Sequence, residues 1–296
     1  MRKSADIEMK NKSPKLFINI NDEEIVFSAG NIDENEDYNL LEKLIIPLNG
    51  LINNKISDLE KISDLLKKNI MQIEQKTRFT FKDLIIVLNN FETSFINLTG
   101  YKKLNGTQIS KENITYILNS LKSAVDVSEE NKKILHIFNS EYLLDKKKIY
   151  NLPIGLFGNF YSHSLSFSLI DKNDYKNLIT AFDKSNLKIK KILLDSFVKG
   201  SFISNKFSEI DTFFHIKINE KNSKIFNIEN DSLKYEQKFK FGTDVILNDI
   251  SKITSFKLDI VKEIIDDNPN IQNFTDNQFL EPKYFKNIQF RKIKKK

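Results

Sequence analysis

A β-hairpin pattern occurs twice in this chain, and this repetition constrains the fold more than any other feature. The stretch LFININDEEIVFSA, Leu16 to Ala29, alternates apolar and polar residues on both sides of a polar turn. The stretch FFHIKINEKNSKIFNI, Phe213 to Ile228, is built in the same way. Alternation around a short polar connection predicts two paired strands. Two such hairpins, far apart in the sequence, predict a duplicated fold with one hairpin at the start of each unit.

The residues after the first hairpin predict a helix followed by a strand. The run DLIIVLN, Asp83 to Asn89, is a short and almost continuous apolar stretch, which is typical of a strand buried on both faces. Before it, apolar residues recur three, four or seven positions apart, as on one face of a helix. These residues are Ile56, Leu59, Leu66, Ile70 and Ile73.

A compact unit is predicted between about Thr93 and Asp171. The strand TSFINLT leads to a helix with Ser110 as its N-cap, and the strands KKILHIF and SEYLLDKKKIY follow. The glycine-containing loop NLPIGLFGNF then leads to the strand SHSLSFSLI. Helix and strand patterns alternate again after Asp171, so this unit is predicted to be an insertion in a first lobe.

The second hairpin is followed by the strand LKYEQKFKF and by two helices, one from near Asp244 and one from about Phe256 to Ile265. Beyond Asp267 the apolar pattern weakens. We therefore predict an α/β fold, α+β overall, in four parts. These are a discontinuous first lobe at 14–92 and 172–208, an inserted subdomain at 93–171, a partial second lobe at 209–267 and a basic tail at 268–296.

Composition excludes several classes of function. The 296 residues contain no cysteine, which excludes disulfide bonds and thiolate metal ligands. The start of the chain lacks the apolar core of a secretory signal, and no run reaches the ~18 apolar residues of a membrane-spanning helix, so a cytoplasmic location is expected. The net charge of +6 comes mostly from the terminal RKIKKK, so nucleic acid is not an expected partner. The widely separated His136, His163 and His215 are expected to be structural, and no metal site is expected.

The terminal stretch PKYFKNIQFRKIKKK fits two interpretations. Tyr284, Phe285, Ile288 and Ile293 lie among basic residues, which is the composition of a short amphipathic helix on an anionic membrane. Alternatively, the tail is the exposed stump of a shortened second lobe. Both interpretations remain open from the sequence.

Two hairpin-led units with an insertion in the first resemble the actin and sugar-kinase superfamily, and within it the bacterial cell-division protein FtsA. ILHIFNSEYLLD resembles the family pattern LHvxPxEYxxD, NLPIGLFG resembles its PxGLxG, and GLINNKISDLEKI and GTDVILNDI resemble the starts of two of its helices. The resemblance implies a duplicated actin-like, ribonuclease-H-like fold with an inserted strand-helix-strand-strand subdomain and an incomplete second lobe. The matching residues are Gly50, Ile52, Asn53, Leu135, His136, Glu141, Tyr142, Asp145, Pro153, Gly155, Leu156, Gly158, Gly242, Asp249 and Ile250.

Both hairpin turns depart from the phosphate loops of that family. The family has Asp-x-Gly-Thr and Asp-Ile-Gly-Gly-Gly-Thr, whereas this chain has NIND and KINEKN. Glycine lets backbone N–H groups approach a phosphate, and neither turn contains one. Asp22, Glu23 and Glu24 would also repel a triphosphate. The degenerate phosphate-loop positions are Asn19, Asn21, Asp22, Lys217, Asn219 and Asn222.

The resemblance and these departures together predict a non-catalytic division scaffold at the cytoplasmic face of the membrane. ATP with magnesium is the cofactor of the family, and we expect none here. The expected partners are division proteins, including FtsA itself, through the inserted subdomain; FtsZ is a weaker expectation because its docking site falls in the portion that the chain lacks. Two alternatives are an ATPase with a phosphate site rebuilt around Lys217 or Lys221, and the related actin-like scaffold of type IV pilus assembly.

Overall fold

The computed structural model describes residues 13–21, 24–32, 38–47, 51–52, 55–89 and 91–267. The chain forms two compact units. The first unit comprises Met1–Phe213 and Phe226–Glu236, and the second comprises Phe214–Ile225 and Gln237–Lys296. The predicted tail, together with Asp22, Gly50 and Asn53, lies outside the described residues.

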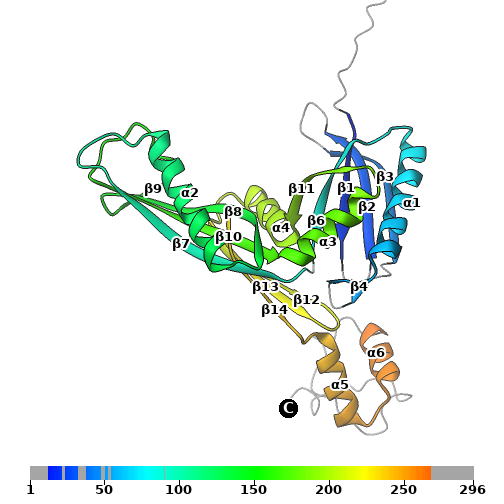
Figure 1. Ribbon diagram of the computed structural model, residues 1–296. Coiled ribbons are helices and arrows are strands. Elements are labelled where there is room, and N and C mark those ends of the chain that lie inside the picture. The colour runs from blue at the N-terminus through cyan, green and yellow to red at the C-terminus, as the bar shows by residue number, and fades with distance from the viewer. Residues whose placement is uncertain are drawn as a thin grey trace, which may run out of the picture. The chain divides into compact units, whose positions relative to one another are not determined.

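Helices and strands follow one another in an order close to the predicted one (Figure 1). Those of the first half of the chain are β1 (Lys15–Ile20), β2 (Glu24–Ile32), β3 (Tyr38–Pro47), β4 (Leu51–Ile52), β5 (Lys55–Ile56), α1 (Leu59–Thr77), β6 (Asp83–Leu88), β7 (Thr93–Lys103), α2 (Lys111–Ser128), β8 (Lys132–Leu144) and β9 (Lys147–Ile149). Those of the second half are β10 (Phe160–Asp171), α3 (Lys172–Asp183), β11 (Lys188–Leu194), α4 (Asp195–Lys206), β12 (Thr212–Ile218), β13 (Ser223–Glu229), β14 (Ser232–Phe239), α5 (Thr243–Thr254) and α6 (Leu258–Asp267).

The first hairpin lies inside a five-stranded sheet with the order β11-β6-β1-β2-β3. Strand β1 is antiparallel to β2 and parallel to β6, so Ile18 lies opposite both Phe27 and Ile86. Strand β11 is parallel to β6, and β3 is antiparallel to β2. The predicted first hairpin is therefore present, and β1 has a neighbour on each side.

Helices α1 and α3 bury one face of this sheet. Leu66 and Ile73 of α1 and Phe182 of α3 are almost inaccessible and belong to the same core as β1. Helix α1 begins after Asp58, whose carboxylate accepts a hydrogen bond from the Lys61 backbone N–H at 2.9 Å, as expected for an N-cap. The predicted helix was too long at this end, because Ile56 lies in β5, ahead of the cap. Strand β6 is fully buried on one face and only partly on the other, which corrects its predicted burial on both faces.

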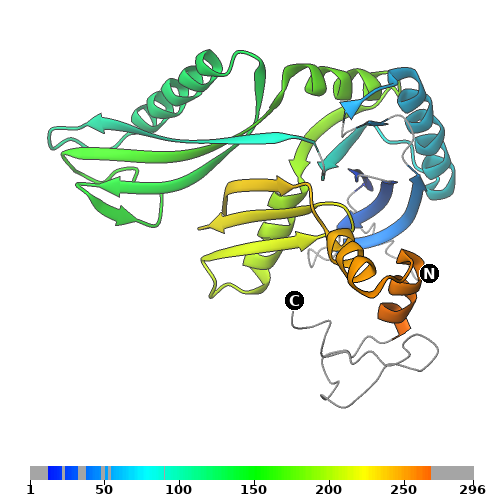
Figure 2. The same cartoon turned by 90° about the horizontal axis from the view of Figure 1, so that it is seen from below.

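The segment between β6 and α3 forms a separate four-stranded sheet with the order β7-β10-β8-β9 (Figure 2). Strand β10 is antiparallel to both β7 and β8, and α2 packs along one face. Two strands were predicted where the structure has the single strand β8. The register shift opposite Ser164 and Leu165 accommodates Asn139 and Ser140 as a β-bulge, so the chain continues as one strand through them.

Strand β3 and helix α4 were not predicted. Strand β3 is an edge strand, and most of its residues are exposed, so the sequence shows no clean alternation. Helix α4 has no side-chain N-cap and buries only small or polar residues, including Gly200. A Cβ atom at Gly200 would lie 2.5 Å from Ile228 Cδ1, so this glycine allows β13 to approach the helix.

Strands β12, β13 and β14 form a three-stranded sheet in that order. The predicted second hairpin is therefore present as β12 and β13. In the second unit, α5 and α6 pack together, and Val261 and Ile264 of α6 are buried. Helix α5 begins at Thr243, as predicted from GTDVILNDI.

Candidate functional site

The first hairpin turn is closed by hydrogen bonds around Asn21. Its backbone N–H donates to the Glu24 carbonyl at 2.9 Å, and its side-chain amide donates to Glu24 Oε1 at 3.2 Å. Asn89, which follows β6, donates from Nδ2 to Asn21 Oδ1 at 3.0 Å. The Asn21 amide therefore bridges β2 and the end of β6, where it holds the turn in place.

Asn19 is the other described site position of this turn. Its Oδ1 atom is buried, and it has no hydrogen-bond partner among the described residues. An asparagine here offers neither the charge of the family's aspartate nor a free carboxylate for a metal. At this position the chain therefore carries a neutral amide where the family carries a carboxylate.

The second hairpin turn is closed in a similar way by two asparagines. The Asn219 backbone N–H donates to the Asn222 carbonyl at 2.8 Å, and Asn219 Nδ2 donates to Asn222 Oδ1 at 2.7 Å. The paired side chains complete the turn without glycine. Both hairpins therefore use asparagine amides where phosphate loops leave backbone N–H groups exposed.

The start of α5 is occupied by carbonyl groups of this turn. The Thr243 N–H donates to the Asn219 carbonyl at 3.0 Å, and the Asp244 N–H donates to the Glu220 carbonyl at 2.9 Å. The approach requires Gly242, because a Cβ atom there would lie 2.2 Å from the Asn219 oxygen and 2.3 Å from the Glu220 oxygen. Helix N-termini bind anions through such free N–H groups. Here the turn itself takes up two of those donors.

Charge at the second turn is mixed. Glu220 Oε1 lies 2.6 Å from Lys262 Nζ of α6, and this bond lowers the pKa of the Glu220 carboxyl below its usual value. Lys217 and Lys221 lie in the same hairpin, as predicted. Asn19 and Asn21 belong to the first unit, whereas Lys217, Asn219 and Asn222 belong to the second.

The inserted sheet has two chemically different faces. Leu165 and Phe167 of β10 are fully buried with Val125 of α2. Successive strand residues point to opposite faces, so the alternate residues of β10 point away from α2. These are Ser162, Ser164, Ser166 and Ser168. The serines recur at every second position of SHSLSFSLI. A strand was predicted from this pattern, but it was not predicted that one face of the strand is polar.

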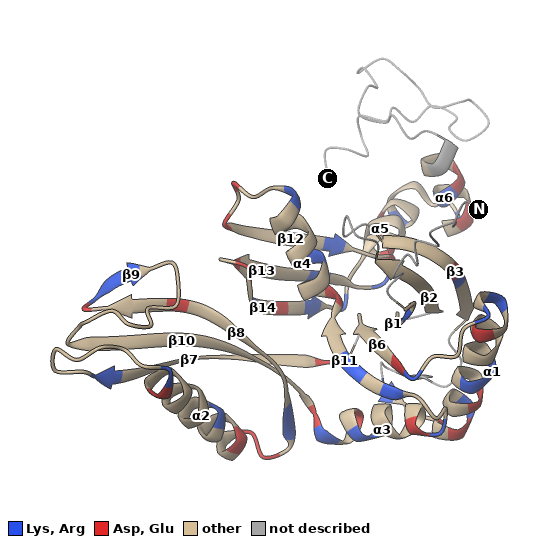
Figure 3. Ribbon diagram, turned by 90° about the horizontal axis from the view of Figure 1, so that it is seen from above, with Lys and Arg blue, Asp and Glu red and all other residues tan. Residues whose placement is uncertain are grey.

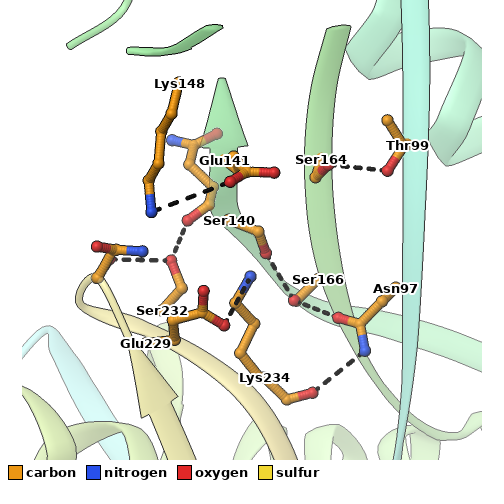
Figure 4. A network of polar contacts seen from close by, with 12 residues as sticks. Asn97, Thr99, Ser140, Glu141, Lys148, Ser164, Ser166, Glu229, Ser232 and Lys234 are labelled. Carbon is orange, nitrogen blue, oxygen red and sulfur yellow. Dashed lines mark hydrogen bonds and ion pairs between the residues drawn. The ribbon is translucent and has the colours of Figure 1, made fainter. Parts of the chain in front are cut away.

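Small polar groups form a bonded row across the serine face (Figure 4). Ser166 Oγ lies 2.9 Å from Ser140 Oγ of the β8 bulge, and it also donates to Asn97 Oδ1 of β7. Thr99 and Ser164 bond to each other at 2.8 Å one step further along the same strands. The β-bulge thus has a function in the fold, because it brings Ser140 into this row.

The tip of the β13–β14 hairpin covers the serine face near its base. Ser232 donates to the Asn139 carbonyl of β8, and Asn97 Nδ2 donates to the Lys234 carbonyl at 3.5 Å (Figure 4). Lys234 also lies 3.8 Å from Glu229. Burial lowers the Lys234 pKa, although Glu229 opposes this shift. The β13–β14 hairpin therefore covers the base of the serine face.

The distal end of the inserted sheet carries exposed aromatic residues. Tyr101 of β7 and Phe160 of β10 are 68% and 41% exposed, and their rings stack with centroids 5.5 Å apart. Tyr150 and Phe157 lie in the loops at the same end and are 82% and 68% exposed. We call Tyr101, Tyr150, Phe157 and Phe160 the distal aromatic surface.

The residues of the two sequence motifs build this distal end. The Asp145 carboxylate accepts the backbone N–H groups of Asn159 and Phe160 at 2.9 and 2.8 Å, which holds the start of β10 beside the end of β8. A Cβ atom at Gly158 would lie 2.3 Å from Leu144 Cδ1, so glycine is needed for close packing. Gly155 has φ of +85° in the connecting loop, a conformation that favours glycine.

His136 of β8 and His163 of β10 lie in the same sheet. Burial lowers the pKa of each to about 4, so both imidazoles are neutral near pH 7. His163 Nε2 lies 3.0 Å from Asn139 Oδ1, and its ring packs against Tyr142. Within the described ranges, no group of three His, Asp or Glu side chains could hold a metal ion. No helix in this part of the chain is long and apolar enough to span a membrane.

Comparison with solved structures shows the fold. One chain of a PilM-PilN type IV pilus biogenesis complex superposes with a TM-score of 0.53 over 87% of this chain and 73% of that chain, at 10% identity. Together with the strand order of the first unit, this shows that the chain has the predicted α/β, actin-like fold. No family model matches the sequence.

Several curated proteins that are similar to this chain in sequence are FtsA proteins. The cell-division protein FtsA of Buchnera aphidicola subsp. Schizaphis graminum is 21% identical over 194 residues, which are 66% of this chain and 46% of that protein. FtsA of the subspecies Baizongia pistaciae is 22% identical over 247 residues, which are 83% of this chain and 58% of that protein. FtsA of Escherichia coli K12 is 22% identical over 147 residues, which are 50% of this chain and 34% of that protein. The chain spans about half the length of the curated relatives it matches. The predicted resemblance is confirmed, and the chain is a distant homologue of FtsA.

Proposed function

We propose that this chain is a cell-division scaffold of the FtsA type, which works in the cytoplasm at the division site through protein contacts of its inserted sheet and does not hydrolyse ATP. The observation that carries the proposal is the distal aromatic surface. It lies on the subdomain whose motifs most resemble FtsA, and those motifs hold its strands in place through Asp145 and Gly158.

Exposed aromatic residues favour a protein partner for this surface. Tyr and Phe are enriched in protein interfaces because their large rings bury much apolar area at a small cost in side-chain entropy. Lys148, whose Nζ lies 6.0 Å from the centroid of the Tyr150 ring and 3.9 Å from Glu141, supplies a polar group beside that ring. A second copy of the chain is the partner that we propose first, with other division proteins as further partners.

The hairpin turns support the non-catalytic part of the proposal. Phosphoryl transfer depends on preorganised donors and a metal aligned with the phosphates. Asn21 and Asn219 occupy positions where such loops carry glycine, and the Thr243 and Asp244 amides already donate to carbonyl groups. We therefore propose that ATP with magnesium is not a cofactor of this chain.

Charge gives no support for a nucleic-acid partner. Lysines and acidic residues alternate along α1 and α3 in Figure 3, so these helices present mixed charge rather than a basic stripe. A phosphate backbone is bound by clustered basic residues. The absence of nucleic acid among the partners remains a prediction.

A second candidate is an actin-like scaffold of type IV pilus assembly. The shared fold with a chain of the PilM-PilN complex favours it, whereas the curated sequence relatives favour division. Binding of the purified chain to PilN, the other protein named in that complex, in preference to FtsA, would support this candidate.

Self-association of the full chain tests the proposed contact. Sedimentation velocity over a range of protein concentrations should show reversible assembly, and the double substitution Tyr101→Ser and Phe160→Ser should weaken it at least tenfold. Val127→Ser is the matched control, because Val127 is 70% exposed on α2 of the same subdomain. Equal assembly of the double variant and the control would refute the role of the distal aromatic surface.

A further inference from the structure

The distal end of the inserted sheet carries a concentration of positive charge. Residues 100–109 and 141–160 build this end, and they contain five lysines but only two acidic residues. The lysines are Lys102, Lys103, Lys146, Lys147 and Lys148, and the acidic residues are Glu141 and Asp145. Figure 3 shows blue at the end of β7 and along β9. The charge of this end therefore differs from the mixed charge of α1 and α3.

The two acidic residues compensate this charge only in part. The Asp145 carboxylate is used within the fold, where it accepts the N–H groups of Asn159 and Phe160. Glu141 Oε1 lies 3.9 Å from Lys148 Nζ, and a partly exposed pair of this kind is weak. The other lysines of this end form no ion pair with a residue that the structure describes. Their charge is therefore available to a partner.

The β8–β9 turn carries a lysine at a position that favours other residues. Leu144 and Lys147 pair across the hairpin, so Asp145 and Lys146 are its two turn residues. Their φ angles are +47° and +67°. Turns with two such angles favour asparagine and glycine, because a Cβ atom is strained in this region. Strain of this kind is concentrated at functional positions, which supports a use for the Lys146 charge at the tip.

Two lysines flank the exposed rings on one face of the sheet. The pairing of β7, β10, β8 and β9 places Tyr101 and Lys148 in one row across the sheet. Lys103 pairs with Phe160 in the next row. Paired residues point to the same face, so Lys103 on the β7 edge and Lys148 on the β9 edge lie on either side of the stacked rings. These edges are ~14 Å apart, because three strand spacings of ~4.8 Å separate them.

We propose that the partner of the distal aromatic surface presents an acidic segment to it, with carboxylates on both sides of an apolar group. This inference rests on the proposed function, which places a protein partner at this surface. The apolar group packs on the rings of Tyr101 and Phe160, and the carboxylates meet Lys103 and Lys148. Opposite charges around an apolar contact speed association and select the partner.

The charge also separates two ways in which copies of the chain can meet. A two-fold contact places the same surface of both copies face to face. Lysines of one copy would then face lysines of the other, and like charges oppose such a contact. Removing lysines would strengthen a two-fold contact, whereas it weakens a contact with an acidic segment. The direction of the effect therefore tells the two apart.

Sedimentation velocity of the full chain tests the inference. Lys103→Gln combined with Lys148→Gln should weaken assembly about tenfold, and added salt should weaken the assembly of the unsubstituted chain more than that of this variant. Lys122→Gln combined with Lys133→Gln is the matched control, because it removes the same charge from exposed positions of the same subdomain. Equal or tighter assembly of the first variant would overturn the inference, and would leave the aromatic contact of the proposed function intact.

A chain that does not assemble with itself is tested with a defined probe. A synthetic peptide of alternating glutamate and leucine should bind the unsubstituted chain in fluorescence anisotropy, and should bind Lys103→Gln with Lys148→Gln about tenfold more weakly. The same peptide with glutamine in place of glutamate should not distinguish the two proteins. Absence of binding by the glutamate peptide would overturn the inference. Lysine-dependent binding of phosphatidylglycerol vesicles or of an oligonucleotide in its place would do the same.

Discussion

The two hairpins share a sequence pattern but have different surroundings. In the first hairpin, β1 lies in the middle of a five-stranded sheet, and its alternate apolar residues are buried under α1 and α3. In the second, the same positions of β12 are more than half exposed. Both turns have lost glycine, and both are closed by asparagine side chains. The comparison shows that alternation predicts a strand but not how much of it the fold buries.

The largest expected effect comes from truncating equivalent residues of the two hairpins. Ile18→Ala should lower the free energy of unfolding by about 4 kcal/mol, because it leaves a cavity at a residue with no solvent exposure. Ile216→Ala, at the matching position of β12, should cost about 1 kcal/mol or less, since the side chain is 63% exposed. Urea unfolding followed by circular dichroism measures both, because the chain has no tryptophan. Similar losses would contradict the difference in burial.

Gly242→Ala should have the next largest effect. The added Cβ would lie within 2.3 Å of two carbonyl oxygens, so the second turn must move away from α5, at a cost of about 2 kcal/mol. Hydrogen exchange should show faster exchange of the Thr243 and Asp244 amides. Lys221→Ala, at an exposed residue of the same turn, is the control and should change neither quantity. Unchanged amide exchange in Gly242→Ala would mean that the carbonyl groups do not cap the helix.

Acid should destabilise the first unit through its inserted sheet. His136 and His163 have pKa values of about 4 in the fold, against about 6.5 in an unfolded chain. The unfolded state therefore binds protons first, and stability that is complete above pH ~6.5 is lost as the pH falls toward about 4. Each histidine should cost about 1 kcal/mol between pH 7 and pH 5.5.

The double substitution His136→Gln and His163→Gln should flatten this pH dependence in urea titrations. Lys133→Gln, on the same strand as His136, should retain it. If the double variant keeps the full slope, the acid sensitivity has another source.

The smallest expected effect is on nucleotide binding. Asn21→Gly combined with Asn219→Gly restores a glycine to each turn, yet we expect no ATP binding in calorimetric titration with magnesium up to millimolar ATP. The α5 amides stay bonded to carbonyl groups, and Asn19 still lacks a carboxylate. The unsubstituted chain is the control. Micromolar binding by either protein would sink the non-catalytic proposal and revive a phosphate site near Lys217 or Lys221.

Local chemistry accounts for what could be predicted from the sequence. Helix α2 was predicted with its cap, because Ser110 and Asn113 form a reciprocal capping box that depends only on neighbours in sequence. The bulge at Ser140 was missed, since its role depends on a bond to Ser166 on another strand. The absence of glycine from the two hairpin turns is likewise visible in the sequence. The hydrogen bonds from the first amides of α5 to the Asn219 and Glu220 carbonyl groups were missed, because they depend on tertiary contact.

The pairing of the two ends of the inserted sheet has a consequence for folding order. Thr93, its first residue, lies opposite Ile170, close to its last. Strands β6 and β11 flank the insertion and pair in parallel, so while the insertion is unfolded their pairing closes a loop of about a hundred residues. If the insertion folds first, its paired ends bring β6 and β11 close together. The loop that remains to be closed is then about a quarter as long, which lowers the entropic cost of closure by about 1 kcal/mol. We therefore expect the inserted sheet to fold before the five-stranded sheet that carries it is complete.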